Sequence, residues 1–95
     1  MFGTVAKLKA KPGELDALLD LSEEAEHPPR AVAEYVYQME EDPSTLYLVV
    51  VFEDEKSYRA NAESPEQHER FMKMMQHLEA EPEWHDGHII HRYEA

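Results

Sequence analysis

The hydrophobic pattern of the chain predicts several strands of different burial. Residues 46–52, LYLVVVF, form an unbroken apolar run, which predicts a strand covered on both faces. Residues 2–11 and 31–40 instead alternate between two kinds of side chain, as strands with one well-buried face do. In the second of these, one face is expected to carry Ala33, Tyr35, Tyr37 and Met39.

Three other segments have the spacing and boundary residues of helices. Residues 14–25 place leucines on one helical stripe, and the two prolines after His27 end that helix. Asp54 is expected to cap a short helical segment after the apolar strand. Ser64 followed by Pro65 combines a capping side chain with a proline at the first helical position. A further helix is therefore expected to begin at Pro65.

The order of these elements predicts the fold class. Residues 41–45, EDPST, suit a turn that joins neighbouring antiparallel strands. A turn at residues 84–87 and a last strand at residues 88–94 complete the order β-α-β-β-α-β. This is the ferredoxin-like α+β arrangement, a four-stranded antiparallel sheet with the helices on one face. Since the strand at residues 46–52 is apolar on both faces, the helix-free face also requires cover, and a second subunit stacked sheet on sheet would provide it.

Composition limits the class of protein and its partners. The 95 residues predict one domain spanning residues 1–95, and the absence of Cys excludes disulfides and thiolate chemistry. Asp and Glu number 21 against 9 Lys and Arg, a formal charge of −12, which repels nucleic acid and anionic membranes. No cationic leader pattern and no apolar stretch of membrane-spanning length occur in the sequence, so a cytoplasmic protein is expected.

The chain resembles the antibiotic biosynthesis monooxygenase family of dimeric α+β barrel proteins. The resemblance rests on the apolar third strand ending in Phe52, on Ser64-Pro65 with His68, and on Leu78 and Pro82 before the last strand. It implies a homodimer in which each subunit holds a small-molecule cleft between its sheet and its helices. The family includes cofactor-independent oxygenases of aromatic polyketides, quinol oxygenases, haem-degrading enzymes and members of no established activity.

The sequence departs from parts of the family pattern. Phe52 stands where the family often has Trp, and Asn61 where it often has His. Haem-degrading members of the family have a Trp shortly before the Ser-Pro position and an Asn in the first strand. This chain has Asn61 in the former region and no Asn at residues 2–11, so haem degradation is disfavoured.

His68 is the leading candidate for acid–base chemistry. It precedes Phe71 by three residues, so it extends the helical face expected to meet the sheet and points toward the cleft. A partly buried His can act as a base, a hydrogen-bond donor or a ligand. The alternative is a His at the core edge whose imidazole is satisfied by a backbone carbonyl or a carboxylate.

Asn61 and Tyr58 are candidates for stabilising an anion. They lie three residues apart and so share a helical face. In a cofactor-free oxygenase the substrate supplies electrons as an enolate or phenolate, which an amide and a hydroxyl can stabilise in a dry pocket. The alternative is that Asn61 ends a helical turn and Tyr58 is packing.

The expected pocket-lining residues are Tyr35, Tyr37, Phe71 and Met75. The alternative is that these apolar side chains belong to the ordinary core.

His85, His88 and His91 are spaced by threes, but a strand would send His88 and His91 to opposite sides, so no metal site is expected. The chain has only three Gly and no G-x-G-x-x-G pattern, so no nucleotide cofactor is expected.

The combined prediction is a cofactor-independent monooxygenase acting on a small aromatic, polyphenol or quinol-like molecule, with His68 as base and Asn61 and Tyr58 orienting the anion. Two alternatives use the same fold. One is a non-catalytic small-molecule-binding or stress-response dimer, and the other is an enzyme resembling muconolactone isomerase.

Overall fold

The structure, a computed structural model, describes residues 1–24 and 27–95. Its elements follow one another as β1 (Phe2–Lys9), α1 (Leu15–Glu24), β2 (Ala31–Gln38), β3 (Thr45–Phe52), α2 (Glu55–Ala62), α3 (Pro65–Met75) and β4 (Glu83–His88). The predicted order of strands and helices is confirmed. The predicted last residue of the first helix, Ala25, lies outside the described residues.

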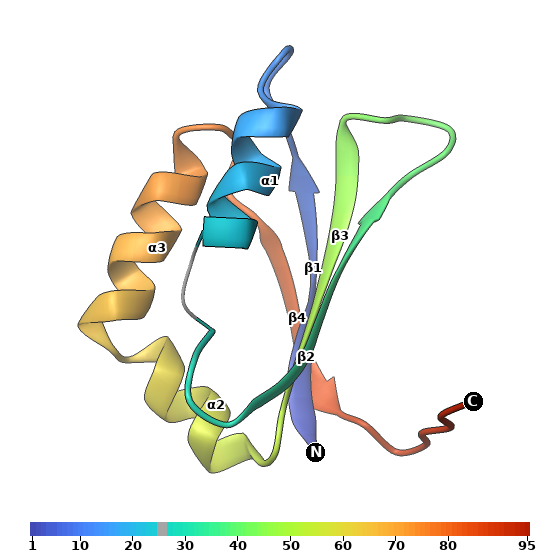
Figure 1. The fold of residues 1–95 in the computed structure, drawn as a ribbon, viewed down its shortest axis with the longest axis vertical. Helices are drawn as coiled ribbons and strands as arrows, with labels where there is room; N and C mark the ends of the chain where they lie inside the picture. The colour runs from blue at the N-terminus through green and yellow to red at the C-terminus, as the bar shows by residue number, and fades with distance from the viewer. Residues whose placement is uncertain (25–26) are drawn as a thin grey trace.

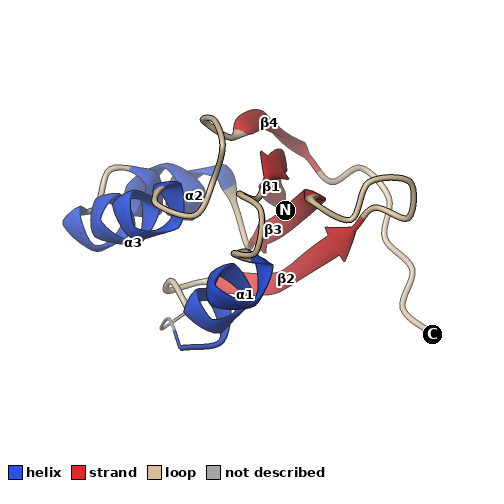
Figure 2. Cartoon of the chain, turned by 90° about the horizontal axis from the view of Figure 1, so that it is seen from above, coloured by secondary structure: helices blue, strands red, loops and turns tan. Residues whose placement is uncertain are grey.

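The four strands form one antiparallel sheet in the order β2-β3-β1-β4. Figures 1 and 2 show α1, α2 and α3 on the same face of this sheet, which confirms the ferredoxin-like α+β prediction. The two central strands, β1 and β3, pair from Phe2 with Phe52 to Lys9 with Thr45. Because strand residues alternate between faces, Thr4, Ala6 and Leu8 turn toward the helices.

The last strand differs from its prediction. It spans Glu83–His88, whereas the sequence pattern placed a turn at residues 84–87 and the strand at residues 88–94. The cause is pairing with β1, which begins at Phe2 opposite His88 and leaves no partner strand for the residues beyond. An edge strand needs little apolar content, so its polar sequence resembles that of a turn. This correction moves Trp84 and Asp86 into the sheet, on the face covered by the helices.

Both predicted caps of the second helical region are confirmed. Asp54 has extended backbone, and its carboxylate accepts a hydrogen bond from the Ser57 N–H at 2.7 Å. The Ser64 hydroxyl accepts from the Gln67 N–H at 3.1 Å, with Pro65 at the first helical position. These caps separate α2 from α3 and determine where each helix begins over the sheet.

The packed core occupies one end of the helix-covered face. Its buried residues are Ala6, Leu8, Ala10, Leu18, Leu46 and Leu78. In the strand register, Leu8 pairs with Leu46 at this end, while Thr4 pairs with Val50 toward the other end. Large aliphatic side chains fill the space between sheet and helices at the Leu8 end. Beyond Thr4, at the other end, Phe2 and Phe52 are also buried.

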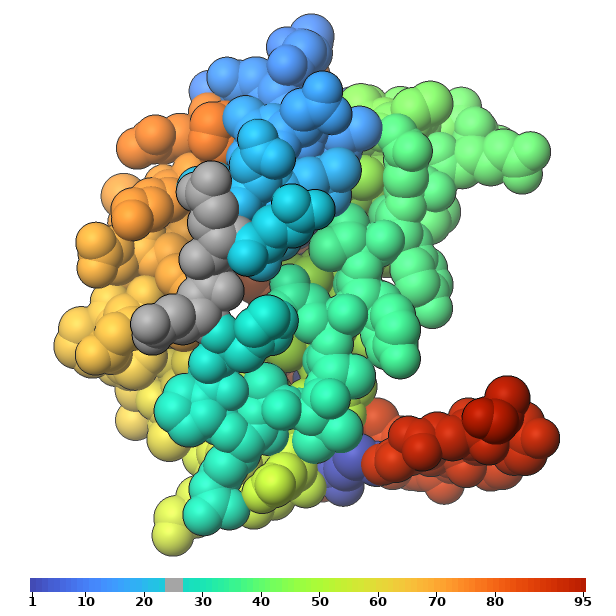
Figure 3. Space-filling view, viewed as in Figure 1, coloured from blue at the N-terminus to red at the C-terminus, as the bar shows by residue number. Residues whose placement is uncertain are grey.

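The helix-free face of the sheet carries exposed apolar side chains. Val5 is 42% exposed at its centre, and Tyr35 and Tyr37 are 57% and 54% exposed on β2. Figure 3 shows residues 89–95 (red) extending away from the body of the molecule, and Ile90 in this segment is 94% exposed. Apolar groups of this kind, gathered on one face, are typical of a surface that another molecule covers.

Candidate functional site

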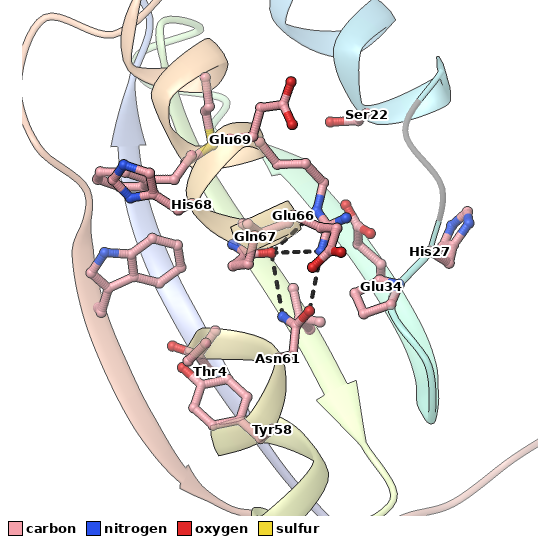
Figure 4. Close-up of a pocket in the computed structure, with 18 of the residues that line it drawn as sticks. Thr4, Ser22, His27, Glu34, Tyr58, Asn61, Glu66, Gln67, His68 and Glu69 are labelled. Atoms are coloured by element: carbon pink, nitrogen blue, oxygen red, sulfur yellow. Dashed lines mark hydrogen bonds between the residues drawn. The ribbon is translucent and has the colours of Figure 1, made fainter. Parts of the chain in front are cut away.

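A cavity of ≈ 920 Å³ lies between the sheet and the helices, toward the Thr4 end of the sheet. We call it the helix-side cavity. Its apolar wall includes Leu18, Leu48, Val50, Phe52, Phe71 and Trp84. Its volume lies in the range of small-molecule sites, and an apolar wall with a few polar groups is the usual composition of such sites. Figure 4 shows the polar side chains that enter it.

The first polar group joins α2 to the edge strand. The Tyr58 hydroxyl donates a hydrogen bond to Asp86 Oδ1 at 2.7 Å, and Arg59 Nη1 lies 3.3 Å from Asp86 Oδ2. The Tyr58 ring packs against Phe2 and Phe52, with ring centroids 5.2 and 5.5 Å away. Tyr58 is therefore held by aromatic packing on one side and by a carboxylate on the other.

This arrangement shifts the pKa of both partners. Burial of the hydroxyl, together with its hydrogen bond to Asp86, raises the pKa of Tyr58 to about 12. Burial alone would raise the pKa of Asp86, but the hydrogen bond from Tyr58 and the nearby charge of Arg59 lower it below its ordinary value. At neutral pH the pair is a neutral phenol donating to an ionised carboxylate. Tyr58 is thus suited to hydrogen bonding and not to service as a base.

The Thr4 hydroxyl lies beside Tyr58, as Figure 4 shows. Thr4 is 5% exposed, and its Oγ1 makes no hydrogen bond of ordinary geometry to the described residues. A buried hydroxyl without a partner is costly unless a ligand or water satisfies it. The Thr4 end of the cavity therefore offers a hydrogen-bonding position to a ligand.

The second polar group joins α2 to α3. Arg70 Nη2 donates to Asn61 Oδ1 at 3.1 Å, and Arg70 Nε donates to Gln67 Oε1 at 3.2 Å. Asn61 Nδ2 donates to the same Gln67 oxygen at 3.3 Å. A guanidinium has no acceptor, so both amides must present oxygen to it, which fixes their orientation. Asn61 is therefore part of an ordered network in the cavity wall.

His68 also lines the helix-side cavity. Figure 4 shows it on the opposite side of the cavity from His27 and Glu34. Its side chain is exposed, whereas the sequence pattern predicted partial burial. His68 lies in the first turn of α3, whereas the residues of this helix that pack against the core, Met74 and Met75, lie at its end. Its imidazole is in contact with solvent and with the cavity at once.

The four predicted pocket-lining residues do not all line the cavity. Phe71 lines the helix-side cavity. Met75 packs against the core beyond it, because one further turn of α3 carries the side chain to the Leu8 end. Tyr35 and Tyr37 do not line the cavity, which corrects their predicted placement. They pair with Val49 and Tyr47 and share the helix-free face.

The three histidines that are spaced by threes in the sequence do not form a cluster. His85 and His88 lie on opposite faces of β4, and His91 follows the strand. Among the side chains of residues 1–23 and 27–95, no three His, Asp or Glu are grouped as metal ligands would be. In the same part of the chain, no helix has both the length and the apolar content needed to span a membrane.

Known proteins resemble this arrangement of sheet, helices and cavity. The model of the family described as "Antibiotic biosynthesis monooxygenase" matches residues 1–74. The chain belongs to this family. A comparison of this chain with curated proteins found no match.

Solved structures share the fold over nearly its whole length. A provisionally assigned antibiotic biosynthesis monooxygenase from Chloroflexus aurantiacus is similar with a TM-score of 0.80 and 23% identity, over 98% of this chain and 96% of that one. A conserved protein from Methanosarcina mazei has a TM-score of 0.77 and 26% identity, over 90% and 89% of the two chains. A provisionally assigned monooxygenase from Bordetella bronchiseptica reaches 0.81 with 15% identity, over 94% and 96%. The likenesses under 25% identity are evidence of fold alone.

Several polar residues of the cavity were not predicted from the sequence, among them Thr4, Gln67, Arg70 and Asp86. Arg70 lies three residues after Gln67, so the two side chains share one face of the same helix. This spacing was the sequence signal for Arg70. The signal for Asp86 was the period-two series of Trp84, Asp86 and His88, which indicates a strand face. Both signals are short and therefore weak without the fold.

Proposed function

We propose that the protein is a cofactor-independent monooxygenase that oxidises a small aromatic, polyphenol or quinol-like molecule in the helix-side cavity. Membership of the monooxygenase family supports the reaction class. The observation that carries the proposal is the cavity of ≈ 920 Å³, whose apolar wall is interrupted by two ordered polar groups. An aromatic ring suits the wall, and ring hydroxyls suit the polar groups.

In the proposed reaction the substrate itself reduces oxygen. A phenolic hydroxyl gives up its proton, and the resulting anion donates electrons to O₂ from a ring carbon that carries hydrogen. That C–H becomes C=O with one oxygen atom, and the other oxygen atom leaves as water. The ring loses four electrons and O₂ gains four, so no further reductant is required. A low-dielectric cavity favours this chemistry only if the anion is hydrogen-bonded.

The proposed roles follow from the donor and acceptor groups of each residue that remain available to a substrate. The exposed imidazole of His68 takes the substrate proton at the rim and releases it to solvent. The proton of Tyr58 is engaged with Asp86, so its oxygen accepts from a substrate hydroxyl. Asn61 gives one amide hydrogen to Gln67 and has another for the substrate anion.

We infer in addition that two subunits stack through their helix-free faces. The exposed apolar side chains of that face, Val5 on the central strand β1 and Tyr35 and Tyr37 on the edge strand β2, support this pairing. A chain of 95 residues buries a modest fraction of its surface alone, so a partner of the same kind would add to its stability.

The test of the reaction is oxygen uptake by the purified protein with a metal chelator, against a panel of quinols and polyphenols. We expect His68→Ala to lower uptake at least tenfold, about 1.4 kcal/mol of transition-state stabilisation. His91→Ala, an exposed imidazole in the segment after β4, is the matched control and should leave the rate unchanged. Equal rates in all three proteins would remove His68 from the mechanism.

One observation favours a second candidate, a non-catalytic small-molecule-binding protein. No side chain among residues 1–23 and 27–95 forms a hydrogen bond with the His68 imidazole, so nothing described orients it as a base. This candidate predicts ligands that raise the melting temperature without oxygen uptake. An isomerase would instead convert its substrate without consuming oxygen.

A further inference from the structure

Arg70 differs in its partners from the other arginines of the chain. Arg30 pairs with Glu53, Arg59 with Asp86 and Glu55, and Arg92 with Glu94. No carboxylate among the side chains of residues 1–23 and 27–95 forms a salt bridge with Arg70. This is notable in a chain with 21 acidic residues and a formal charge of −12.

The hydrogen bonds of Arg70 orient the guanidinium without neutralising it. Nε and Nη2 donate to Gln67 Oε1 at 3.2 and 3.1 Å, and Nη2 donates to Asn61 Oδ1 at 3.1 Å. Both acceptors are neutral amides, so the positive charge stays available to a ligand. Nη1 makes no hydrogen bond to the described residues, which leaves both of its hydrogens free.

Arg70 can be approached from two sides. It lines the helix-side cavity and also a neighbouring cavity of ≈ 710 Å³ beside α2 and residues 27–30. Arg70 is half-buried, whereas Glu34, Glu66 and Glu69 of the helix-side cavity are exposed. Water and salt screen the exposed carboxylates more strongly than the guanidinium. The local attraction for an anion at Arg70 therefore exceeds what the net charge of the chain suggests.

We propose that Arg70 binds the carboxylate of the substrate, and that the cavity accepts aromatic acids in preference to neutral aromatic molecules. A charge-assisted hydrogen bond from Nη1 to a carboxylate oxygen satisfies the guanidinium, and the aromatic ring lies on the apolar wall formed by residues such as Phe71 and Val50. The proposal rests on the helix-side cavity being the substrate site proposed above. It does not rest on the oxygen chemistry.

The test compares two probes of the same shape, 2-naphthoate and 2-naphthamide, by calorimetry. We expect the wild type to bind 2-naphthoate at least ten times more tightly. Arg70→Met should abolish this preference and leave the affinity for 2-naphthamide unchanged, which also shows that the cavity is intact. Arg92→Met, which makes the same charge change outside both cavities, should keep the preference.

Equal affinity of the wild type for both probes, binding of neither, or a preference that survives in Arg70→Met would overturn the proposal. If Arg70→Met does not fold, Arg70→Lys decides, because lysine keeps the charge but lacks the planar fork. A fall of the preference by threefold or more supports the proposal, and an unchanged preference overturns it. Oxygen uptake is measured separately, so preference for 2-naphthoate without uptake would reject the oxygenase and retain Arg70 as the anion site.

Discussion

The hydroxyl of Tyr58 donates a hydrogen bond to Oδ1 of Asp86 at 2.7 Å, and this bond connects α2 to the edge strand β4. The same ring contacts Phe2 and Phe52 from the two central strands. One side chain therefore joins the helix to three of the four strands at the Thr4 end of the sheet. This contact lies at the end of the helix-side cavity opposite the core cluster around Leu8.

Removing the Tyr58 hydroxyl tests the strength of this connection. Tyr58→Phe retains the ring contacts and loses the hydrogen bond to a charged acceptor, so we expect the free energy of unfolding to fall by about 1–2 kcal/mol. Urea unfolding at neutral pH measures the difference. Tyr93→Phe removes the hydroxyl of a side chain that is 83% exposed, and should change stability by less than about 0.5 kcal/mol. Equal effects of the two substitutions would contradict the structural role of the bond.

The pKa of Tyr58 gives a second prediction, at alkaline pH. Burial and the hydrogen bond to Asp86 raise this pKa from 10.0 to about 12. The folded state thus holds a proton that the unfolded state releases, so the stabilisation is complete below pH 10.0 and is lost as pH rises toward about 12. The ultraviolet absorbance of ionised tyrosine measures this directly. The difference between wild type and Tyr58→Phe should titrate near pH 12, and a difference that titrates near 10.0 would disprove the shift.

The helix boundaries could be predicted because their signals are local. Asp54 and Ser64 each bond to a backbone N–H three residues ahead, so the few residues around them determine the cap. The edge strand could not be predicted in the same way. Its residues are polar because only one neighbour and one covered face constrain them, and pairing with β1 determines its position.

The candidate site was predicted less completely, for two physical reasons. Alternation shows that Tyr35 and Tyr37 share a face, but which face the helices cover depends on the whole sheet. Arg70 attracted no prediction because its partners, Asn61 and Gln67, are neutral amides whose role appears only when α2 and α3 meet. His68 and Phe71 both line the cavity, and helical spacing alone relates them to each other, but the exposure of His68 was not predicted.

The proposed dimer can be tested at the centre of the helix-free face. Val5→Glu places a charge where stacked sheets would exclude water, so we expect the particle mass to fall from twice 11.1 kDa to 11.1 kDa. Light scattering after size-exclusion chromatography measures the mass. The matched control is Met72→Glu on α3, since Met72 is 52% exposed and lies away from this face. A wild type of 11.1 kDa, or a Val5→Glu variant that keeps the doubled mass, would reject the proposed interface.

Gly3 and Gly87 face each other across β1 and β4, and the same substitution should affect them differently. A Cβ at Gly3 would overlap the carbonyl oxygen of Val50 on β3, whereas a Cβ at Gly87 would meet no atom within 4 Å. Because backbone in a central strand cannot move without breaking its pairing, Gly3→Ala should lower the free energy of unfolding by about 1–3 kcal/mol. Gly87→Ala should change it by less than about 0.5 kcal/mol. Urea unfolding of both variants measures these changes. Equal losses of stability would indicate a general cost of alanine in this sheet and would contradict a local overlap at Gly3.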